Sequence, residues 1–301
     1  MSITHILVAL SLDADSQRVA ERAVQLAQQH DARLIAVHIL SKAFAFDDNI
    51  ATPSDIAATA STAINHMKDG IAQQMQSLLS GAADPILHIE QGRKYEVIER
   101  LAQSYGASLI ILGSGSGGTK GLKKKLFGST ADRLARLANF PILLVRNPAA
   151  APYRHIAVGM DFSNHAKAAT TAAKALFPAA FIDLIHAVNI PLPLEQAMLK
   201  TGTSQADISA YRNALAASAR KQARGTFGTN GRLPDHMRIQ IVHGDPAAQL
   251  LKASRRKSID LMALGAQGSS GLARNLLGSV ARKLLQSARS DVLIMPNGAA
   301  D

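Results

Sequence analysis

A glycine-rich segment in the second half of the chain has the spacing of an anion-binding loop. Gly265, Gly268 and the pair Gly278-Ser279 are separated by two and then nine residues. Glycines let the main chain approach a phosphate closely and accept positive φ, so successive N–H groups can converge on the anion. The pair opens a helical pattern from Val280 to Ser287, whose first N–H groups and dipole favour negative charge. The chemistry that this spacing predicts is the binding of a phosphate group.

A related segment in the first half admits three other interpretations. Gly113 to Gly118 satisfies the dinucleotide pattern G-x-G-x-x-G. It follows the fourth apolar run of its half rather than the first, and no acidic residue closes a second strand about 20 positions later. Thr119-Lys120 then resembles the end of a P-loop, but the lysine and hydroxyl stand in the wrong order. Turn glycines without a ligand are the third alternative. The repeated spacing in the two halves favours the phosphate-binding interpretation.

The segments lie within an internal repeat that organises the whole chain. Six anchor sequences return in the same order at offsets of 148 to 152 residues. They begin with HILVA at His5 to Ala9 and HIAVG at His155 to Gly159, and end with PILLV at Pro141 to Val145 and DVLIM at Asp291 to Met295. The chain is therefore predicted to contain two copies of one domain, residues 1–147 and 154–301, joined by a short connector rich in proline and alanine.

Each copy has the pattern of an α/β domain. Short apolar runs alternate with helical spacings such as Val19, Ala23, Leu26 and Ala27. The apolar runs show almost no polar alternation, as expected for parallel strands whose two faces are both covered by helices. We predict two tandem repeats of an open, doubly wound five-stranded parallel-sheet domain, Rossmann-like in architecture. Two loosely patterned stretches, 41–66 and 191–211, follow the second strand of each copy.

The composition excludes several classes of protein. The chain has 301 residues, 47% of them apolar, and no cysteine, which excludes disulfides, thiolate nucleophiles and Cys-ligated metal centres. Its apolar runs are shorter than the roughly 18 residues of a membrane span, and no secretory signal begins the chain. We therefore expect a cytoplasmic protein without a membrane span. Most of the net charge of +11 lies in the second half, which favours a solvated basic surface over a site for nucleic acid, anionic lipid or polyphosphate. No stacking pattern predicts a nucleic-acid partner.

Other candidate residues have structural interpretations. His38 and His186 occupy matching positions in the second strands of the two copies, which favours packing at strand ends over ligation. No histidine spacing typical of a transition-metal site occurs, so no metal site is predicted. Asp245-Pro246 has the pattern of a helix cap followed by proline in the first turn. We predict no catalytic residue.

These motifs give the chain a family resemblance. It is similar to the universal stress proteins, in the tandem form that carries two such domains. The family's pattern G-x2-G-x9-G-[ST] is matched without gaps by Gly265, Gly268, Gly278 and Ser279. The resemblance implies an open five-stranded α/β sheet and binding of ATP, or of AMP or ADP, with or without Mg²⁺. It also implies pairing of two domains along their last strands, within one chain or in a homodimer.

The resemblance implies a set of contacts in the second copy. Asp161 holds the position of the family's aspartate near base and ribose, and its carboxylate can accept hydrogen bonds from ribose hydroxyls or the exocyclic amine. Ala187 would meet adenine through its backbone and Leu264 would pack on base or ribose. The phosphate contacts would come from the glycines, their neighbours and the helix start: Gly265, Gly268, Ser269, Gly278, Ser279 and Val280.

The first copy departs from the pattern in two respects. Ser11 replaces the aspartate, and the loop is longer because we expect the preceding strand to end at Gly113. Its corresponding contacts would come from Ile39, Leu112, Gly115, Gly118, Gly128, Ser129 and Thr130. Lys120 and Lys123 to Lys125 stand beside this loop and could attract phosphates. The second site is therefore favoured for nucleotide.

The sequence predicts a nucleotide-binding regulatory protein of the stress response, with at most slow ATP hydrolysis. It offers no general base placed to activate water against a γ-phosphate. Two alternatives stay open: an ATP-dependent enzyme on the same fold, and an interaction module with both sites empty.

Overall fold

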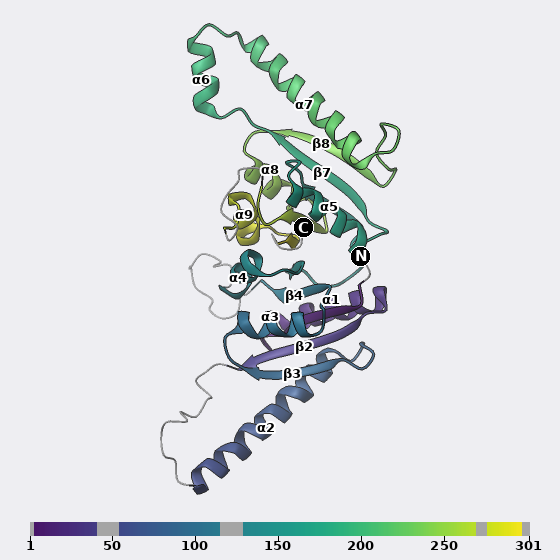
Figure 1. Ribbon diagram of the computed structural model, residues 1–301, viewed down its shortest axis with the longest axis vertical. Helices are drawn as coiled ribbons and strands as arrows, with labels where there is room; N and C mark the ends of the chain where they lie inside the picture. The colour runs from purple at the N-terminus through teal and green to yellow at the C-terminus, as the bar shows by residue number, and fades with distance from the viewer. Residues whose placement is uncertain (1–2, 41–53, 115–128, 269–275, 297–301) are drawn as a thin grey trace. The chain divides into compact units, whose positions relative to one another are not determined.

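The computed structural model describes residues 3–40, 54–114, 129–268 and 276–296. It has two compact units: the first comprises Met1–Leu134 and Phe140–Pro152, and the second comprises Ala135–Asn139 and Tyr153–Asp301. Among the described residues each unit contains five parallel strands with helices between them (Figure 1). The α/β class and the repeated, doubly wound architecture expected from the sequence are confirmed.

The first unit holds its strands in the order β3-β2-β1-β4-β5. The strands are β1 (His5–Ala9), β2 (Arg33–Leu40), β3 (Ile86–Gln91), β4 (Leu109–Gly113) and β5 (Ile142–Val145). The helices are α1 (Ser16–His30), α2 (Ser54–Leu78), α3 (Lys94–Ser104) and α4 (Ser129–Leu137). Neighbouring strands within the unit pair in parallel throughout.

The second unit repeats this arrangement in the order β8-β7-β6-β9-β10. The strands are β6 (His155–Gly159), β7 (Phe181–Val188), β8 (Met237–His243), β9 (Leu261–Gly265) and β10 (Asp291–Met295). The helices are α5 (Asn164–Leu176), α6 (Leu192–Lys200), α7 (Gln205–Phe227), α8 (Pro246–Ala253) and α9 (Ser279–Ser287). These strands are parallel as well.

The burial pattern explains why these runs form central strands. Every residue of β10, and the middle three residues of β1 and β6, are buried, because helices cover the sheet on both faces. In each unit the direction of the crossovers reverses at the first strand, between β1 and β4 and between β6 and β9. The carboxyl ends of the strands diverge at such a point and leave a crevice, where open α/β sheets bind ligands.

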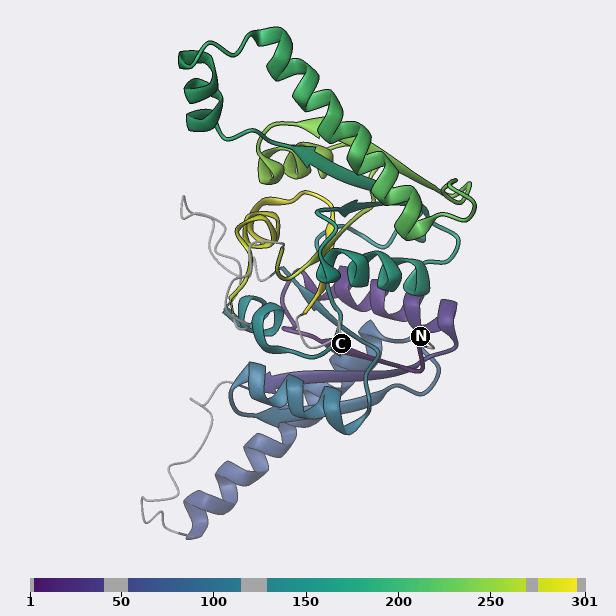
Figure 2. The same cartoon turned by 45° about the horizontal axis from the view of Figure 1, so that its top comes forward.

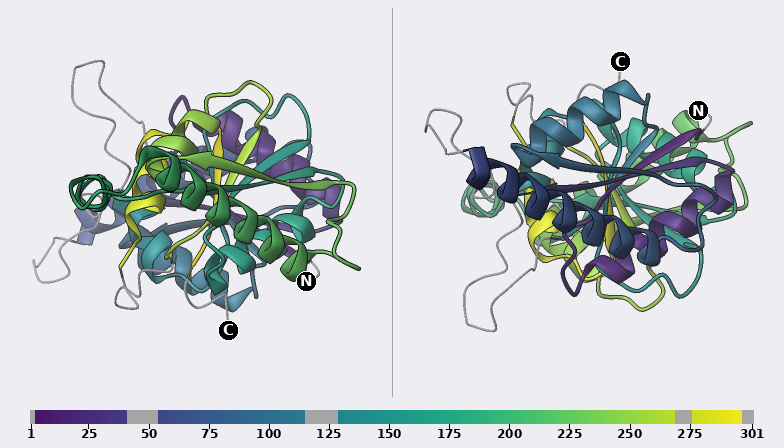
Figure 3. Two further views of the ribbon diagram at one scale, coloured as in Figure 1. Left: turned by 90° about the horizontal axis from the view of Figure 1, so that it is seen from above. Right: turned by 90° about the horizontal axis from the view of Figure 1, so that it is seen from below.

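The stretches after the second strands form peripheral helices. Residues 41–53 lie outside the described residues, and α2 follows them; its last turns contact β3, whereas its first turns extend beyond the sheet (Figures 1 and 2). In the second unit α7 lies across β7 and β8 (Figure 3, left). The shorter helix α6 buries no residue. Within the described residues, no helix is long and apolar enough to cross a membrane.

One pair of strand residues distinguishes the two sheets. Asp183 on β7 and Arg238 on β8 are register partners, and the guanidinium donates through Nε and, at 2.9 Å, through Nη2 to the carboxylate. The Asp183 side chain is 3% exposed, and its hydrogen bond raises the pKa of Arg238. At the equivalent register position the first sheet pairs Ile35 with Ile86. The second sheet thus has an ion pair where the first has an apolar contact.

The end of α1 allows a test of local strain. Asp31 caps this helix with φ of 50°, a left-handed conformation that a Cβ disfavours, and places a carboxylate at the negative end of the helix dipole. We expect Asp31→Gly to stabilise the protein by about 0.5–1 kcal/mol, measured by urea unfolding. Asp31→Ala removes the charge but keeps the Cβ. An equal gain from both substitutions would contradict an origin in the backbone.

Candidate functional site

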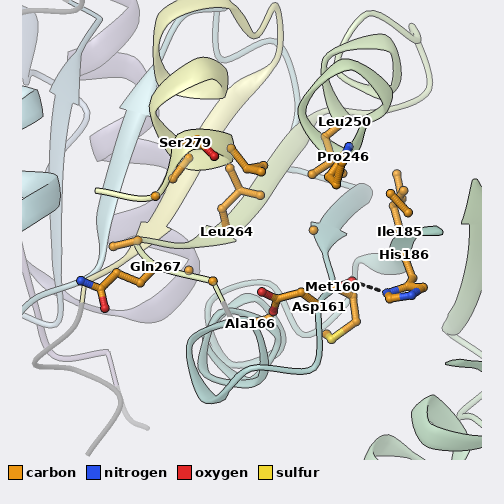
Figure 4. A pocket seen from close by; sticks show the side chains of 18 residues that line it. Met160, Asp161, Ala166, Ile185, His186, Pro246, Leu250, Leu264, Gln267 and Ser279 are labelled. Carbon is orange, nitrogen blue, oxygen red and sulfur yellow. Dashed lines mark hydrogen bonds between the residues drawn. The ribbon is translucent and has the colours of Figure 1, made fainter. Parts of the chain in front are cut away.

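A cavity of about 240 Å³ opens at the carboxyl edge of the second sheet, where the crossover direction reverses (Figure 4). Its walls come from the ends of β6, β7 and β9 and from the first turns of α8 and α9. The second-site residues expected from the sequence that line it are Asp161, Ala187, Leu264, Gly265, Gly268, Gly278, Ser279 and Val280. Ser269 lies outside the described residues. Asp161 and Val280, which are 119 positions apart in sequence, thus share one cavity.

The cavity has two chemically different ends. In Figure 4, Ser279 and Gln267 stand at one side, and Pro246, Leu250 and Ile185 at the other. We call these the amide end and the apolar end. Asp161 and Leu264 lie between them. An elongated ligand with one polyanionic end and one flat apolar end matches this distribution.

The amide end is built from main-chain N–H groups at the start of α9. Gly278 is the N-cap residue, and its own N–H donates to the carbonyl of Ala266 at 2.8 Å. The first N–H to bond back to the cap is that of Arg282, which donates to the Gly278 carbonyl at 2.9 Å. The N–H groups of Ser279, Val280 and Ala281 precede it and have no acceptor within the helix. They face a cavity that these residues line, with the positive end of the helix dipole behind them.

Glycine is required at two of these positions because the main chain passes too close to neighbouring atoms for a Cβ. A Cβ on Gly265 would lie 2.5 Å from the Cβ of His165, and one on Gly268 would lie 2.7 Å from Oδ2 of Asp161. Neither glycine, nor Gly278 with φ of −58°, has the positive φ that the sequence argument also allowed for. That part of the expectation was wrong. The loop needs space beside α5 and the Asp161 carboxylate, because the main chain passes directly over them.

Asp161 is held by the turn between β6 and α5. Its Oδ1 accepts from the Ser163 N–H at 3.0 Å and from the Ser163 hydroxyl at 2.6 Å, while Oδ2 faces Gly268. Phe162 between them has φ of 63°, and Leu12 at the same place in the first unit has φ of 56°. Both are bulky residues in the left-handed region, a strained conformation that is typical of functional turns.

The two matched histidines stabilise the ends of the first strands. Nδ1 of His186 donates to the Met160 carbonyl at 2.8 Å, as the dashed line in Figure 4 shows, and Nδ1 of His38 donates to the Leu10 carbonyl at 2.9 Å. The ring of His186 also packs on Phe162, with centroids 5.2 Å apart. The hydrogen bond fixes Met160, which precedes Asp161, and the ring contact fixes Phe162, which follows it, so the histidine positions the pocket wall.

A second cavity, of about 310 Å³, lies at the equivalent place in the first unit. It is lined by Ile39, Leu112 and Thr130 of the expected contacts, and by Ser11 at the position of Asp161. Gly115, Gly118 and Gly128 lie outside the described residues, as do the lysines of that loop. Ser129 begins α4.

A cation–π contact joins the two helices whose first turns line this first cavity. The guanidinium of Arg133 on α4 lies 5.3 Å from the ring centre of Tyr95 on α3. Burial, with a smaller contribution from the hydrogen bond to Glu99, raises the pKa of Tyr95 to about 12. The ring and the cation therefore keep the starts of α3 and α4 in a fixed relation.

Sequence reasoning missed most of the apolar end. Pro246 and Leu250 line the second cavity, and Lys94 and Ile98 line the first. Asp245 caps α8 as expected, accepting from the Ala248 N–H at 2.8 Å, but the sequence did not reveal that this cap delivers Pro246 to the cavity. The repeat could have indicated this, because Gly92 and Gly244 align and are followed by α3 and α8, the helices that carry these residues.

Comparison with known proteins identifies the fold and the repeat. A family model described as the universal stress protein family matches residues 2–146 and again residues 152–296. The chain belongs to the universal stress protein family. As the repeat predicts, this universal stress protein is a tandem one, with two family domains in one chain.

Its relatives include proteins of both one-domain and two-domain length. Universal stress protein Rv2623 of Mycobacterium tuberculosis is 25% identical over 292 residues, which cover 94% of this chain and 93% of the relative. Universal stress protein A homolog 1 of Coxiella burnetii is 29% identical over 154 residues, 48% of this chain and 97% of the relative. A universal stress protein structure from Archaeoglobus fulgidus shares the fold, with a TM-score of 0.61 at 16% identity, covering 99% of this chain and 97% of that one.

Proposed function

We propose that this universal stress protein is a stress-response regulator that binds an adenine nucleotide, ATP above all, in the pocket of its second domain. One observation carries the proposal. A single cavity places the N–H groups at the start of α9 at one end, the Asp161 carboxylate in the middle and an apolar wall at the other end. Phosphates, ribose and base occur in this order along a nucleotide.

The phosphate end fits on steric grounds. A Cβ on Gly278 would meet the Ala266 carbonyl at 3.4 Å and the Gly268 nitrogen at 3.7 Å, so the missing side chain leaves open the space in front of these main-chain groups. Phosphate oxygens are acceptors for the N–H groups of Ser279 and Val280. A Mg²⁺ ion carried by the phosphates would find no carboxylate at the amide end among the described residues.

The middle and apolar parts fit ribose and adenine. The carboxylate of Asp161 accepts hydrogen bonds only, which suits ribose hydroxyls. Leu264 packs beneath the centre of the cavity, and Pro246 and Leu250 supply a flat apolar wall for the base. Ala187 at the end of β7 offers main-chain groups at this end.

The residues that line the second cavity favour a protein that retains its nucleotide over one that hydrolyses it rapidly. At the amide end the described polar side chains are those of Gln267 and Ser279, neither of which is a general base at neutral pH. Asp161 lies between the two ends, and its Oδ1 already accepts two hydrogen bonds from Ser163. We therefore expect at most slow ATP hydrolysis. A nucleotide held in this way stabilises the fold by mass action and changes the surface that partner proteins meet.

The decisive experiment is calorimetric titration of the full chain with ATP, together with mass spectrometry of any nucleotide that co-purifies. Asp161→Asn retains Oδ1 for Ser163 but removes the negative charge, and we expect it to weaken ATP binding about tenfold. Asp235→Asn, an exposed substitution of the same kind, is the matched control. Absence of heat with ATP would contradict the proposal and favour an interaction module. Rapid turnover of labelled ATP that is lost in Asp161→Asn would favour the enzyme alternative.

We also propose, from the family resemblance, that domains pair along their last strands. Sedimentation of the full chain with and without ATP tests whether this pairing also joins two chains. A single species of 31.8 kDa at all concentrations would exclude a homodimer.

A further inference from the structure

The two pockets of this chain correspond residue by residue. Apart from Asp13 and Asp15, every described residue that lines the first pocket has an equivalent that lines the second. Leu112 stands for Leu264, Ile98 for Leu250 and Thr130 for Val280. The first pocket therefore also has an apolar end beside α3 and an amide end at the start of α4.

Two substitutions reverse the hydrogen-bonding character of the first pocket. Ser11 replaces the Asp161 carboxylate, and Lys94 replaces Pro246. The ammonium group of Lys94 forms no ion pair with the part of the chain that the structure describes. In the second pocket the middle of the cavity holds the Asp161 carboxylate and the apolar end holds no lysine or arginine among its described residues, whereas the equivalent positions of the first pocket hold a hydroxyl side chain and an exposed lysine.

Two acidic residues, Asp13 and Asp15, also line the first pocket, and both make local contacts in the turn after β1. Oδ1 of Asp13 accepts from the Asp15 N–H at 2.9 Å, at the start of α1, and the Asp15 carboxylate pairs with Arg18 at 2.7 Å. These groups hold the turn after β1 in place. They leave Lys94 as the charged group at the apolar end of the described lining.

Lys94 stands where a nucleotide would place its base. It lines the first cavity together with Ile39 and Ile98, the counterparts of Ala187 and Leu250, and it is an exposed residue at the start of α3. A lysine at this position donates hydrogen bonds and accepts none. Guanine presents two acceptors, N7 and O6, on one edge, whereas adenine presents the N6 amine, a donor, beside N7.

We propose that the first pocket selects a nucleotide with a 6-oxopurine base, of the guanine type, over an adenine nucleotide. This inference rests on the proposed function, because it takes the orientation of the nucleotide from the second pocket. The two pockets would then share one backbone architecture but bind two classes of purine. The second pocket offers a hydrogen-bond acceptor that suits adenosine, and the first offers a donor that suits a keto base.

The test uses the full chain carrying Gly278→Val, which is expected to weaken binding in the second pocket about a hundredfold, and titrates it with GTP and with ATP. We expect GTP to bind about tenfold more tightly than ATP, and Lys94→Met to abolish this preference. Lys174→Met, an exposed substitution of the same kind on α5, is expected to leave the preference unchanged. In the unmodified second pocket, Pro246→Lys is expected to raise the affinity for GTP.

The outcomes separate this inference from the proposed function. If the unmodified chain binds ATP but the Gly278→Val chain binds GTP no better than ATP, or binds neither, the proposal for the first pocket is overturned and the proposed function stands. A GTP preference that survives Lys94→Met also overturns it, because another group then selects the base. If the unmodified chain binds neither nucleotide, both proposals fail together.

Discussion

Gly278→Val is expected to lower the affinity of the second pocket for ATP by about 3 kcal/mol, roughly a hundredfold, measured by calorimetry. The conformation of Gly278 is open to any residue, and a Cβ there would make ordinary contacts of 3.4 Å or more. The fold therefore accepts the substitution. The two methyl groups of valine, however, would occupy the space in front of the Gly268 nitrogen and the first N–H groups of α9, where the phosphates would lie.

The control for this prediction is the same substitution at Gly225. That residue lies in α7, and a Cβ on it would have no heavy atom within 4 Å. Gly225→Val is expected to leave ATP affinity unchanged. Equal affinities for all three proteins would show that the phosphates do not lie at the start of α9, whereas a loss in both variants would indicate a general loss of structure.

Arg238→Ala is expected to destabilise the second domain by about 2–3 kcal/mol, measured by urea unfolding followed by circular dichroism. The substitution leaves the carboxylate of Asp183, 3% exposed, without its bidentate partner. The expected loss is below that of a fully buried pair because the Arg238 side chain is itself 57% exposed. The effect arises from the buried carboxylate that loses its partner, since an exposed arginine contributes little by itself.

The first sheet supplies the matched control. It holds Ile35 and Ile86 at the same register position, so an apolar pair is compatible with this architecture. The double variant Asp183→Ile, Arg238→Ile is expected to regain most of the stability lost in Arg238→Ala. A double variant as unstable as the single one would show that the loss comes from the packing of the arginine on Phe181, which lies 5.4 Å from it.

The sequence was sufficient to predict the parts of the site that one continuous segment determines. Gly265, Gly268 and Gly278 carry their spacing with them, and the helix begins at Ser279, next to the predicted start. The strands were predictable because both faces of each are buried, which removes polar alternation. The doubly wound arrangement followed from right-handed crossovers between parallel strands, whereas the order of the strands was not predicted.

Features that depend on register between distant strands were not predictable. Pro246 reaches the pocket because β8 pairs with β7, and Asp183 meets Arg238 for the same reason; neither pairing is encoded in local periodicity. The physical reason for the glycines could not be predicted either. A positive φ and a close approach of the main chain both require glycine, so the sequence alone does not distinguish the two causes. The position of the Asp161 carboxylate beside Gly268 shows that close approach is the cause.

The left-handed turns at Leu12 and Phe162 have a consequence for how such a chain can change. Both copies retain this bend although neither uses glycine and the flanking residues differ. The mouth of each cavity is thus shaped by a shared backbone, which persists while its side chains diverge. Duplication of such a unit yields two receptors whose ligand preferences can drift, or be engineered, independently of each other.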